Sequence, residues 1–233
     1  MSTHRPNRFF ASAAALTTVL ALSGGVLTAC NTSNPTAANA AASVHAGMNH
    51  SPAVKPSRQT VLYANMRTLW DQHMQWTYDA IVAFAADSPG LDATIARLLQ
   101  NQVDIGNAVV PFYGKAAGKQ LTDLLQTHIK EAVPVLTAAK AGDKPALDAA
   151  VTAWYANAAD IGQFLAKANP NWAKNDMPEM MKTHITQTIG YATDVLTGNH
   201  AKAIADYDQA QAHMGEMADM LSAGIVAQFP KKF

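Results

Sequence analysis

The chain has a single cysteine, Cys30, so it cannot form an internal disulfide. It also has no net charge, with Lys+Arg 17 against Asp+Glu 17, whereas a protein that binds nucleic acid is expected to carry a basic surface. Only 13 of its 233 residues are glycine, and it contains no glycine-rich phosphate loop and no dinucleotide fingerprint. No serine or cysteine nucleophile has a base at a recognisable spacing. These absences exclude a nucleic-acid partner and favour a protein that is not an enzyme.

Residues 1–29 have the pattern of an export signal. Arg5 and Arg8 precede an apolar stretch from Phe9 to Leu27 that has no acidic residue. The stretch runs into Leu27-Thr-Ala-Cys30, which resembles a bacterial lipobox. We therefore expect cleavage before Cys30, acylation of that cysteine, and an exported protein anchored to the membrane by its lipid, facing the periplasm or the cell exterior. A plain signal peptide or an uncleaved anchor is the alternative.

Residues 30–58 are rich in Ala, Asn, Ser, Thr and Pro and show no apolar period. This composition is typical of a disordered tether, here joining the anchor to a folded domain at residues 59–233. His45, Met48 and His50 lie within the tether. Two imidazoles and a thioether so close together can bind a soft ion such as copper, so these residues are candidates for an accessory metal site. Chance is the commoner origin of such a cluster in a linker.

The folded part of the sequence repeats itself at an offset of about 56 residues. Asn101-Gln-Val-Asp-Ile-Gly-Asn107 recurs as Asn157-Ala-Ala-Asp-Ile-Gly-Gln163. The same offset takes Thr127-His128-Ile129 to Thr183-His184-Ile185. A fixed period of this length indicates one supersecondary unit used several times, here a helix pair present about three times.

From residue 60 onwards, apolar residues recur at alternating steps of three and four, as on the buried face of an amphipathic helix. Proline and glycine interrupt this pattern five times. The short connections make successive helices antiparallel. The sequence therefore predicts an all-α fold, an up-and-down bundle of about six helices built from a repeated helix pair. The predicted helices span about 60–87, 91–110, 119–141, 145–168, 178–197 and 201–228.

Polar residues recur at matching positions within the apolar stripes. Histidines interrupt the first, third and fifth predicted helices at mid-length, so the bundle should place them at one depth. Acidic residues and a fourth histidine lie at a similar level on the intervening helices. An unpaired buried imidazole or carboxylate costs about 1–3 kcal/mol or more, so this layer must find partners. Its members are His73, His128, His184 and His213, with Asp104, Asp160 and Glu216.

Three interpretations of this layer remain open. In the first, it is structural, and each histidine donates to an Asn or Asp of a neighbouring helix. In the second, the four histidines bind a transition metal, with the carboxylates as further ligands or as their supports. Copper is favoured because methionines such as Met74 and Met214 are near in sequence. Iron and zinc are less favoured, and the Glu-x-x-His motif of di-iron bundles is absent.

The third interpretation concerns aromatic residues where successive helix pairs end. These residues should gather at one end of the bundle, where they would either close the core or form a pocket for a small molecule or a protein partner. They are Phe112, Tyr113, Trp172 and Phe233. The leading functional hypothesis is a transition-metal-binding protein, and the alternative is a scaffold or small-molecule-binding protein whose polar layer is structural.

Several short stretches resemble a family of uncharacterised secreted bacterial helical proteins. Members of that family sometimes carry the label glycosyltransferase or acetylglutamate kinase, but the residues here support neither, because such enzymes would show α/β patterning and phosphate loops. The resemblance implies a helical fold and assigns no residue a role. The stretches are Leu69-Trp-Asp-Gln-His73, Gln102-Val-Asp-Ile-Gly-Asn107, Trp154-Tyr-Ala-Asn157, Asn169-Pro-Asn-Trp172, Asp206-Tyr-Asp and Gln228-Phe-Pro-Lys-Lys-Phe233.

Overall fold

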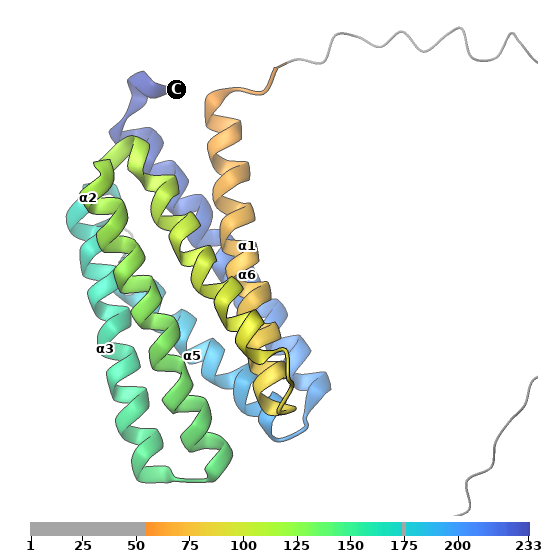
Figure 1. Cartoon of the computed structure of the whole chain (residues 1–233). Helices are drawn as coiled ribbons and strands as arrows, with labels where there is room; N and C mark the ends of the chain where they lie inside the picture. The colour runs from red at the N-terminus through yellow and green to blue at the C-terminus, as the bar shows by residue number, and fades with distance from the viewer. Residues whose placement is uncertain (1–54, 174–175) are drawn as a thin grey trace, which may run out of the picture. The chain divides into compact units, whose positions relative to one another are not determined.

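The computed structural model describes residues 55–173 and 176–233, and within these ranges every regular element is a helix (Figure 1). The predicted all-α bundle is therefore confirmed. The expected signal, most of the expected tether, and with them Cys30, His45, Met48 and His50 lie outside the described residues. No helix in the described part is both long and apolar enough to cross a membrane. The elements are α1 (Arg58–Ala85), α2 (Leu91–Ala141), α3 (Lys144–Ala168), α4 (Pro170–Ala173), α5 (Met177–Leu196), α6 (His200–Gln228) and a final 3₁₀ turn, η1 (Pro230–Lys232).

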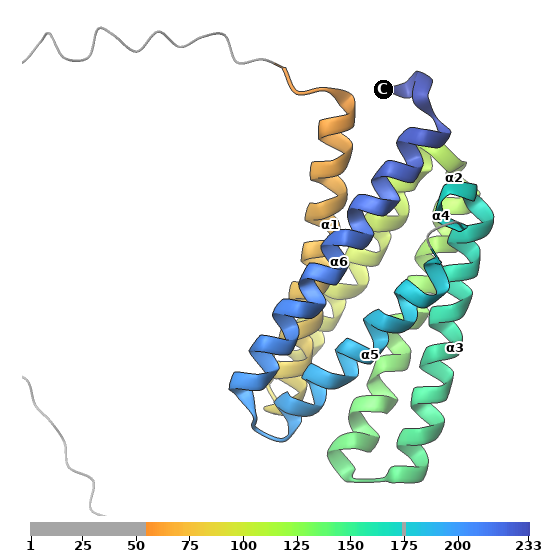
Figure 2. The same cartoon turned by 180° about the vertical axis from the view of Figure 1, so that it is seen from behind.

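The helices form a closed ring in which the last one meets the first. α1 packs against α2 and α6, α3 packs against α2 and α5, and α5 packs against α6 (Figures 1 and 2). The helix boundaries follow the local signals in the sequence. The Ser57 hydroxyl accepts a hydrogen bond from the Thr60 amide at the start of α1, and the Asp143 carboxylate accepts one from the Ala146 amide at the start of α3.

The second and third predicted helices together make up α2 and are separated by a kink at the predicted break. The sequence predicted a break over Pro111-Phe-Tyr-Gly114, but the helix leaves the helical conformation only at Gly114, with φ 85° and ψ 168°. A single glycine is sufficient to reverse the chain because it has no Cβ to clash at positive φ. The two halves of α2, residues 91–113 and 115–141, therefore run in opposite directions from this kink (Figure 1).

Close packing of the two halves of α2 near the kink depends on two more glycines. A Cβ on Gly106 would lie 2.7 Å from the Gly118 carbonyl oxygen, and a Cβ on Gly118 would lie 2.7 Å from the Gly106 carbonyl oxygen. Real Cβ atoms do not approach a backbone atom so closely, so any side chain here would force the halves apart. Away from the kink the halves diverge toward the opposite end of the bundle (Figure 1).

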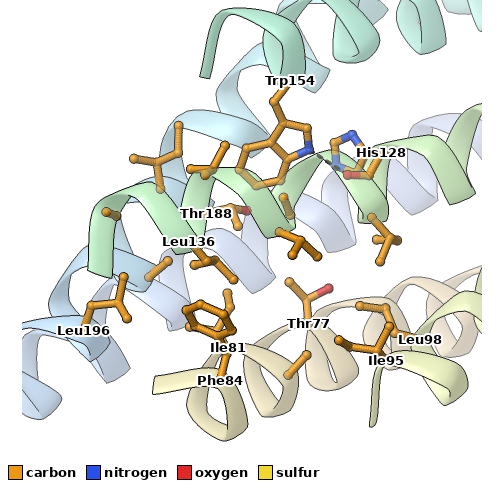
Figure 3. A pocket seen from close by; sticks show the side chains of 18 of the residues that line it. Thr77, Ile81, Phe84, Ile95, Leu98, His128, Leu136, Trp154, Thr188 and Leu196 are labelled. Carbon is orange, nitrogen blue, oxygen red and sulfur yellow. Dashed lines mark hydrogen bonds between the residues drawn. The ribbon is translucent and has the colours of Figure 1, made fainter. Parts of the chain in front are cut away.

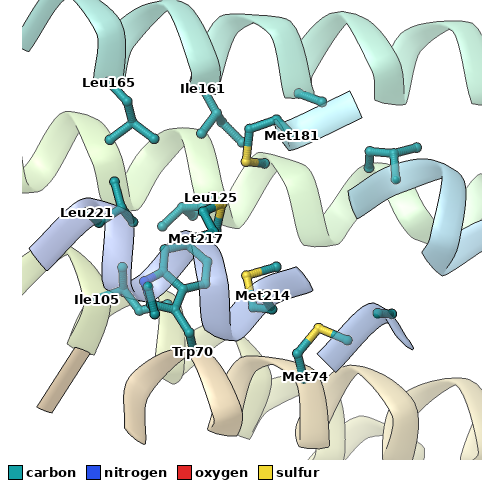
Figure 4. Packing of buried hydrophobic residues seen from close by; sticks show 14 of the residues in the cluster. Trp70, Met74, Ile105, Leu125, Ile161, Leu165, Met181, Met214, Met217 and Leu221 are labelled. Carbon is teal, nitrogen blue, oxygen red and sulfur yellow. The ribbon is translucent and has the colours of Figure 1, made fainter. Parts of the chain in front are cut away.

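The core is unusually rich in methionine. Met74, Met214 and Met217 are each at most 1% exposed, and they pack with Trp70 and Leu125 (Figure 4). Flexible thioether side chains fill irregular gaps between helices that cross at several angles. Burial in the core accounts for the methionines that had favoured copper in the sequence.

Candidate functional site

Three of the predicted histidines lie together inside the bundle. His73 on α1, His128 on the second half of α2 and His184 on α5 are each 2% exposed. The ring centres of His73 and His184 are 5.5 Å apart, and those of His128 and His184 are 5.7 Å apart. We refer to His73, His128 and His184 as the imidazole cluster. Their common depth follows from the matched positions at which they interrupt three apolar stripes.

Amides on the neighbouring helices fix the tautomer of His128. The Asn157 Nδ2 group donates to the Leu124 carbonyl, 3.2 Å away, so the Asn157 Oδ1 atom is the one that faces His128. That oxygen is an acceptor, 3.0 Å from His128 Nδ1, so Nδ1 must carry the proton. The other ring nitrogen of His128, Nε2, therefore has a free lone pair and can only accept while the ring is neutral.

His73 has the opposite tautomer. Gln102 Nε2 lies 2.9 Å from the Leu98 carbonyl and 3.2 Å from Asn101 Oδ1, two acceptors that require an NH₂ group at this position. The same nitrogen faces His73 Nδ1 at 3.2 Å, so two amide protons are shared among three acceptors. Because an amide nitrogen cannot accept, His73 Nδ1 is the acceptor and the proton of this ring is on Nε2. Gln102 is not among the predicted members of the layer, although it lies within the repeated stretch that begins at Asn101.

His184 has no hydrogen bond from either ring nitrogen in the described structure, and its Nδ1 atom is fully buried without a partner. Buried polar atoms are nearly always paired, so an unpaired one marks a place where a water or a ligand is expected. In the imidazole cluster, His128 can accept a hydrogen bond at Nε2 and His73 can donate one at Nε2. His184 makes no hydrogen bond through its ring.

Burial keeps the three rings neutral. Desolvation is the main cause that lowers the pKa of His73 to about 3 and that of His128 to about 4. The pKa of His184 is also lowered well below its ordinary value, again mainly by burial and then by the neighbouring histidines. At neutral pH the cluster therefore carries no charge.

The other predicted members of the layer lie apart from the cluster. Asp104 is partly exposed, accepts from Gln100 at 3.0 Å and lies 3.8 Å from Arg97. Asp160 and Glu216 are exposed. In residues 55–173 and 176–233, no group of three or more His, Cys, Asp or Glu side chains has the arrangement of a metal site.

His213 belongs to a recurring structural contact. Its Nε2 atom donates to the Met180 carbonyl, 3.0 Å away, four residues before His184. Asn101 donates at 3.0 Å to the carbonyl of Leu69, four residues before His73. Asn157 makes the corresponding bond to Leu124, four residues before His128. These contacts join the helices of each pair and support the structural interpretation for the Asn and His213 positions.

An apolar cavity of about 420 Å³ adjoins the imidazole cluster, and the sequence analysis did not predict it. It is lined by residues of α1, α3, α5 and the two halves of α2 (Figure 3). All three cluster histidines line it, while Phe84 and Leu196 line it near the ends of their helices. The cavity therefore extends from the outer, turn-bearing end of the bundle inward to the cluster. We call it the central cavity.

Trp154 lines the central cavity beside His128. Its indole nitrogen donates to the His128 carbonyl at 2.9 Å, and the two ring centres are 5.3 Å apart (Figure 3). Across the cavity, the Thr77 hydroxyl donates to the His73 carbonyl at 2.7 Å. The protons of Trp154, Thr77 and the nearby Thr188 are thus committed to the backbone. The ring nitrogens of the cluster and the lone pairs of the two threonine hydroxyls are the polar side-chain groups left available here.

The four aromatic residues expected at one end of the bundle do gather there and pack on one another. The ring of Tyr113 is 5.3 Å from that of Trp172, and Phe112 stacks on Phe233 at 5.8 Å. Trp172 is 1% exposed, so it closes the core at this end.

Comparison of the chain with family models, with curated proteins and with solved structures finds no match.

Proposed function

We propose that this protein binds one small, largely apolar molecule in the central cavity, with the polar part of that molecule against the imidazole cluster. A single observation carries the proposal: an apolar cavity of about 420 Å³ ends at three buried, neutral histidines, one of which has no hydrogen-bond partner. Ligand pockets of about 300–1,000 Å³, mostly apolar with a few converging polar groups, are typical of small-molecule sites. Nothing in this arrangement requires a reaction, so the proposal is a binding protein.

The uncharged apolar probe N-phenyl-1-naphthylamine is suited to testing this proposal, because its fluorescence rises in apolar surroundings. We expect saturable binding of one probe per chain. Ala132, one helical turn after His128, lines the cavity. The substitution Ala132→Leu adds three carbons to this space and should weaken binding at least tenfold, on the order of 1.4 kcal/mol or more.

Ala223→Leu on the exposed face of α6 is the matched control and should leave the affinity unchanged. Equal binding by the two variants, or no saturable binding by the folded protein, would show that the cavity is not the site.

A transition metal at the imidazole cluster is a second candidate. Two of the ring spacings favour it, although no three side chains in the described part are arranged as a metal site. Three imidazoles bound to one ion at ~2.0 Å have ring centres roughly 5–6 Å apart, close to the observed 5.5 and 5.7 Å. A soft ion such as copper suits neutral imidazoles, with iron and zinc as lesser candidates. Binding through all three Nε2 atoms requires His73 to move its proton to Nδ1, which faces the Gln102 NH₂ group. The outlying Asp104, Asp160 and Glu216 are not needed in this version of the site.

Elemental analysis of protein purified from its own source separates the two candidates. A metal protein should carry about one equivalent of copper, iron or zinc, and the His128→Ala, His184→Ala double variant should lose it. Less than a tenth of an equivalent after exchange against Cu(I) and Zn(II) would remove this candidate and leave the apolar ligand.

The amino-terminal sequence supports an exported protein anchored to the membrane through acylated Cys30. Fatty-acid labelling tests this part independently of the cavity. We expect Cys30→Ser to abolish incorporation of a labelled fatty acid, and incorporation that persists in the variant would rule out this anchor.

A further inference from the structure

We infer that the molecule held in the central cavity carries an uncharged head group that both donates and accepts a hydrogen bond, as an alcohol or a phenol does. The inference rests on the proposed function, because it concerns the same cavity. It adds the chemical class of the ligand, which the volume and the apolar lining alone leave open.

The hydrogen-bond pattern of the cluster supplies the first argument. His128 Nδ1 is committed to the Asn157 oxygen, so its Nε2 atom offers a lone pair. His73 Nδ1 faces the Gln102 NH₂ group, which cannot accept, so the ring proton of His73 is on Nε2. A hydroxyl group can donate to the first and accept from the second at the same time. An ether or a ketone can only accept, and an alkyl group can do neither.

Unmade hydrogen bonds at the cluster supply the second argument. His184 has a buried, unpaired Nδ1 atom, and its ring centre is 5.5 Å from that of His73 and 5.7 Å from that of His128. A ligand with no polar head would leave the Nε2 atoms of His73 and His128 unpaired in an apolar space, and each unpaired buried group is costly. A head group that satisfies them gains in affinity relative to a plain hydrocarbon.

The third argument is electrostatic and excludes a charged head group on the ligand. No cationic side chain lines the cavity, and the two carboxylates that do, Asp92 and Asp148, lie near the first turns of α2 and α3 at its outer end. A ligand carboxylate would enter past these negative charges and reach rings that are neutral. An ammonium head would meet no carboxylate at the inner end. Burying an unpaired charge costs far more than burying a hydroxyl with two partners.

Three molecules of matched shape test the inference by calorimetric titration at pH 7.5: 4-butylphenol, butylbenzene and 4-butylbenzoate. Apolar transfer alone ranks butylbenzene first, because a hydroxyl prefers water to an apolar space. We expect the reverse, with the phenol binding about tenfold more tightly than butylbenzene and at least tenfold more tightly than the benzoate.

Two variants assign this preference to the cluster. His128→Leu should remove the preference for the phenol while butylbenzene still binds, which shows that the cavity remains intact. Ser222→Ala is the matched control, because it removes a buried hydroxyl that lies outside the cavity lining and donates to the Ala218 carbonyl. It should leave the ratio of the two affinities unchanged.

The possible results distinguish the proposed hydroxyl head group from the proposed binding of an apolar molecule in the central cavity. Equal or tighter binding of butylbenzene or the benzoate, with N-phenyl-1-naphthylamine still bound, overturns the head-group inference and leaves the cavity site. Failure of all three molecules and of that probe overturns both. A preference for the phenol that survives in His128→Leu assigns it to other groups and likewise overturns the inference.

Discussion

Lowering the pH from 7.5 to 5 should reduce the free energy of unfolding by roughly 6 kcal/mol. In the folded protein, burial holds the pKa of His73 at about 3 and that of His128 at about 4, and it lowers the pKa of His184 as well. In the unfolded chain the same groups titrate near 6.5. Below that value the unfolded chain binds protons that the folded protein does not, so stability falls as the pH falls.

The size of the effect follows from proton linkage. Each histidine that is protonated only in the unfolded chain lowers stability by about 1.4 kcal/mol per pH unit, so three give ~4 kcal/mol per unit near pH 5. Stability is complete above about pH 7.5, and it is lost progressively toward the folded pKa values. Glu131, whose pKa burial raises, works in the opposite direction but is one group against three. A loss of ~6 kcal/mol approaches the whole stability of many domains.

Urea unfolding followed by circular dichroism at several pH values measures this dependence. His184→Leu is the sharpest comparison, because His184 makes no hydrogen bond that the substitution would break. This variant should lose roughly 2 kcal/mol less than the parent between pH 7.5 and 5. The same pH dependence in both proteins would mean that the cluster is not the source of the acid sensitivity.

Replacing Trp172 with alanine should lower the free energy of unfolding by about 3–5 kcal/mol. The side chain is 1% exposed, and its indole nitrogen donates to the Leu221 carbonyl at 3.1 Å. Its ring rests directly on Gly224, where a Cβ would lie 2.1 Å from the indole nitrogen. Alanine therefore leaves a large cavity at the aromatic end of the core and removes the hydrogen bond of the indole.

Trp76→Ala is the control for Trp172→Ala, because it makes the same change of residue at a less buried position. Trp76 is only partly buried, and the Arg97 guanidinium lies 5.5 Å from its ring centre, so we expect a loss of about 1 kcal/mol. Denaturant midpoints measure both variants. Similar losses would show that Trp172 does not close the core. Under native conditions Trp172→Ala should still bind N-phenyl-1-naphthylamine, because Trp172 does not line the central cavity.

Much of the fold was predictable from the sequence because helices are encoded locally. The three-and-four spacing of apolar residues, Ser57 and Asp143 as caps, and the breaks at Pro89-Gly90 and Gly198-Asn199 set most helix boundaries to within a few residues. The same spacing gave the buried positions of the cluster histidines, since a residue inside an apolar stripe shares the burial of its neighbours.

Which polar residues meet the histidines was decided by tertiary packing. Asn101 and Asp104 are three residues apart, so they lie on the same side of the helix. The boundary between the buried and the exposed face nevertheless runs between them. Asn101 is buried and Asp104 is not, and only the orientation of the helix against its neighbours determines this. For the same reason Gln102, rather than an acidic residue, contacts His73.

The sequence by itself determined the helices, their order and the depth of the three histidines, because each of these depends on residues a few positions apart. The sequence also marked the break at Pro111-Phe-Tyr-Gly114, but only the tertiary structure decided the approach of Gly106 to Gly118 and the divergence of the two halves of α2 beyond it. The central cavity results from that divergence. It is a space between side chains from four helices, so no stretch of sequence encodes it.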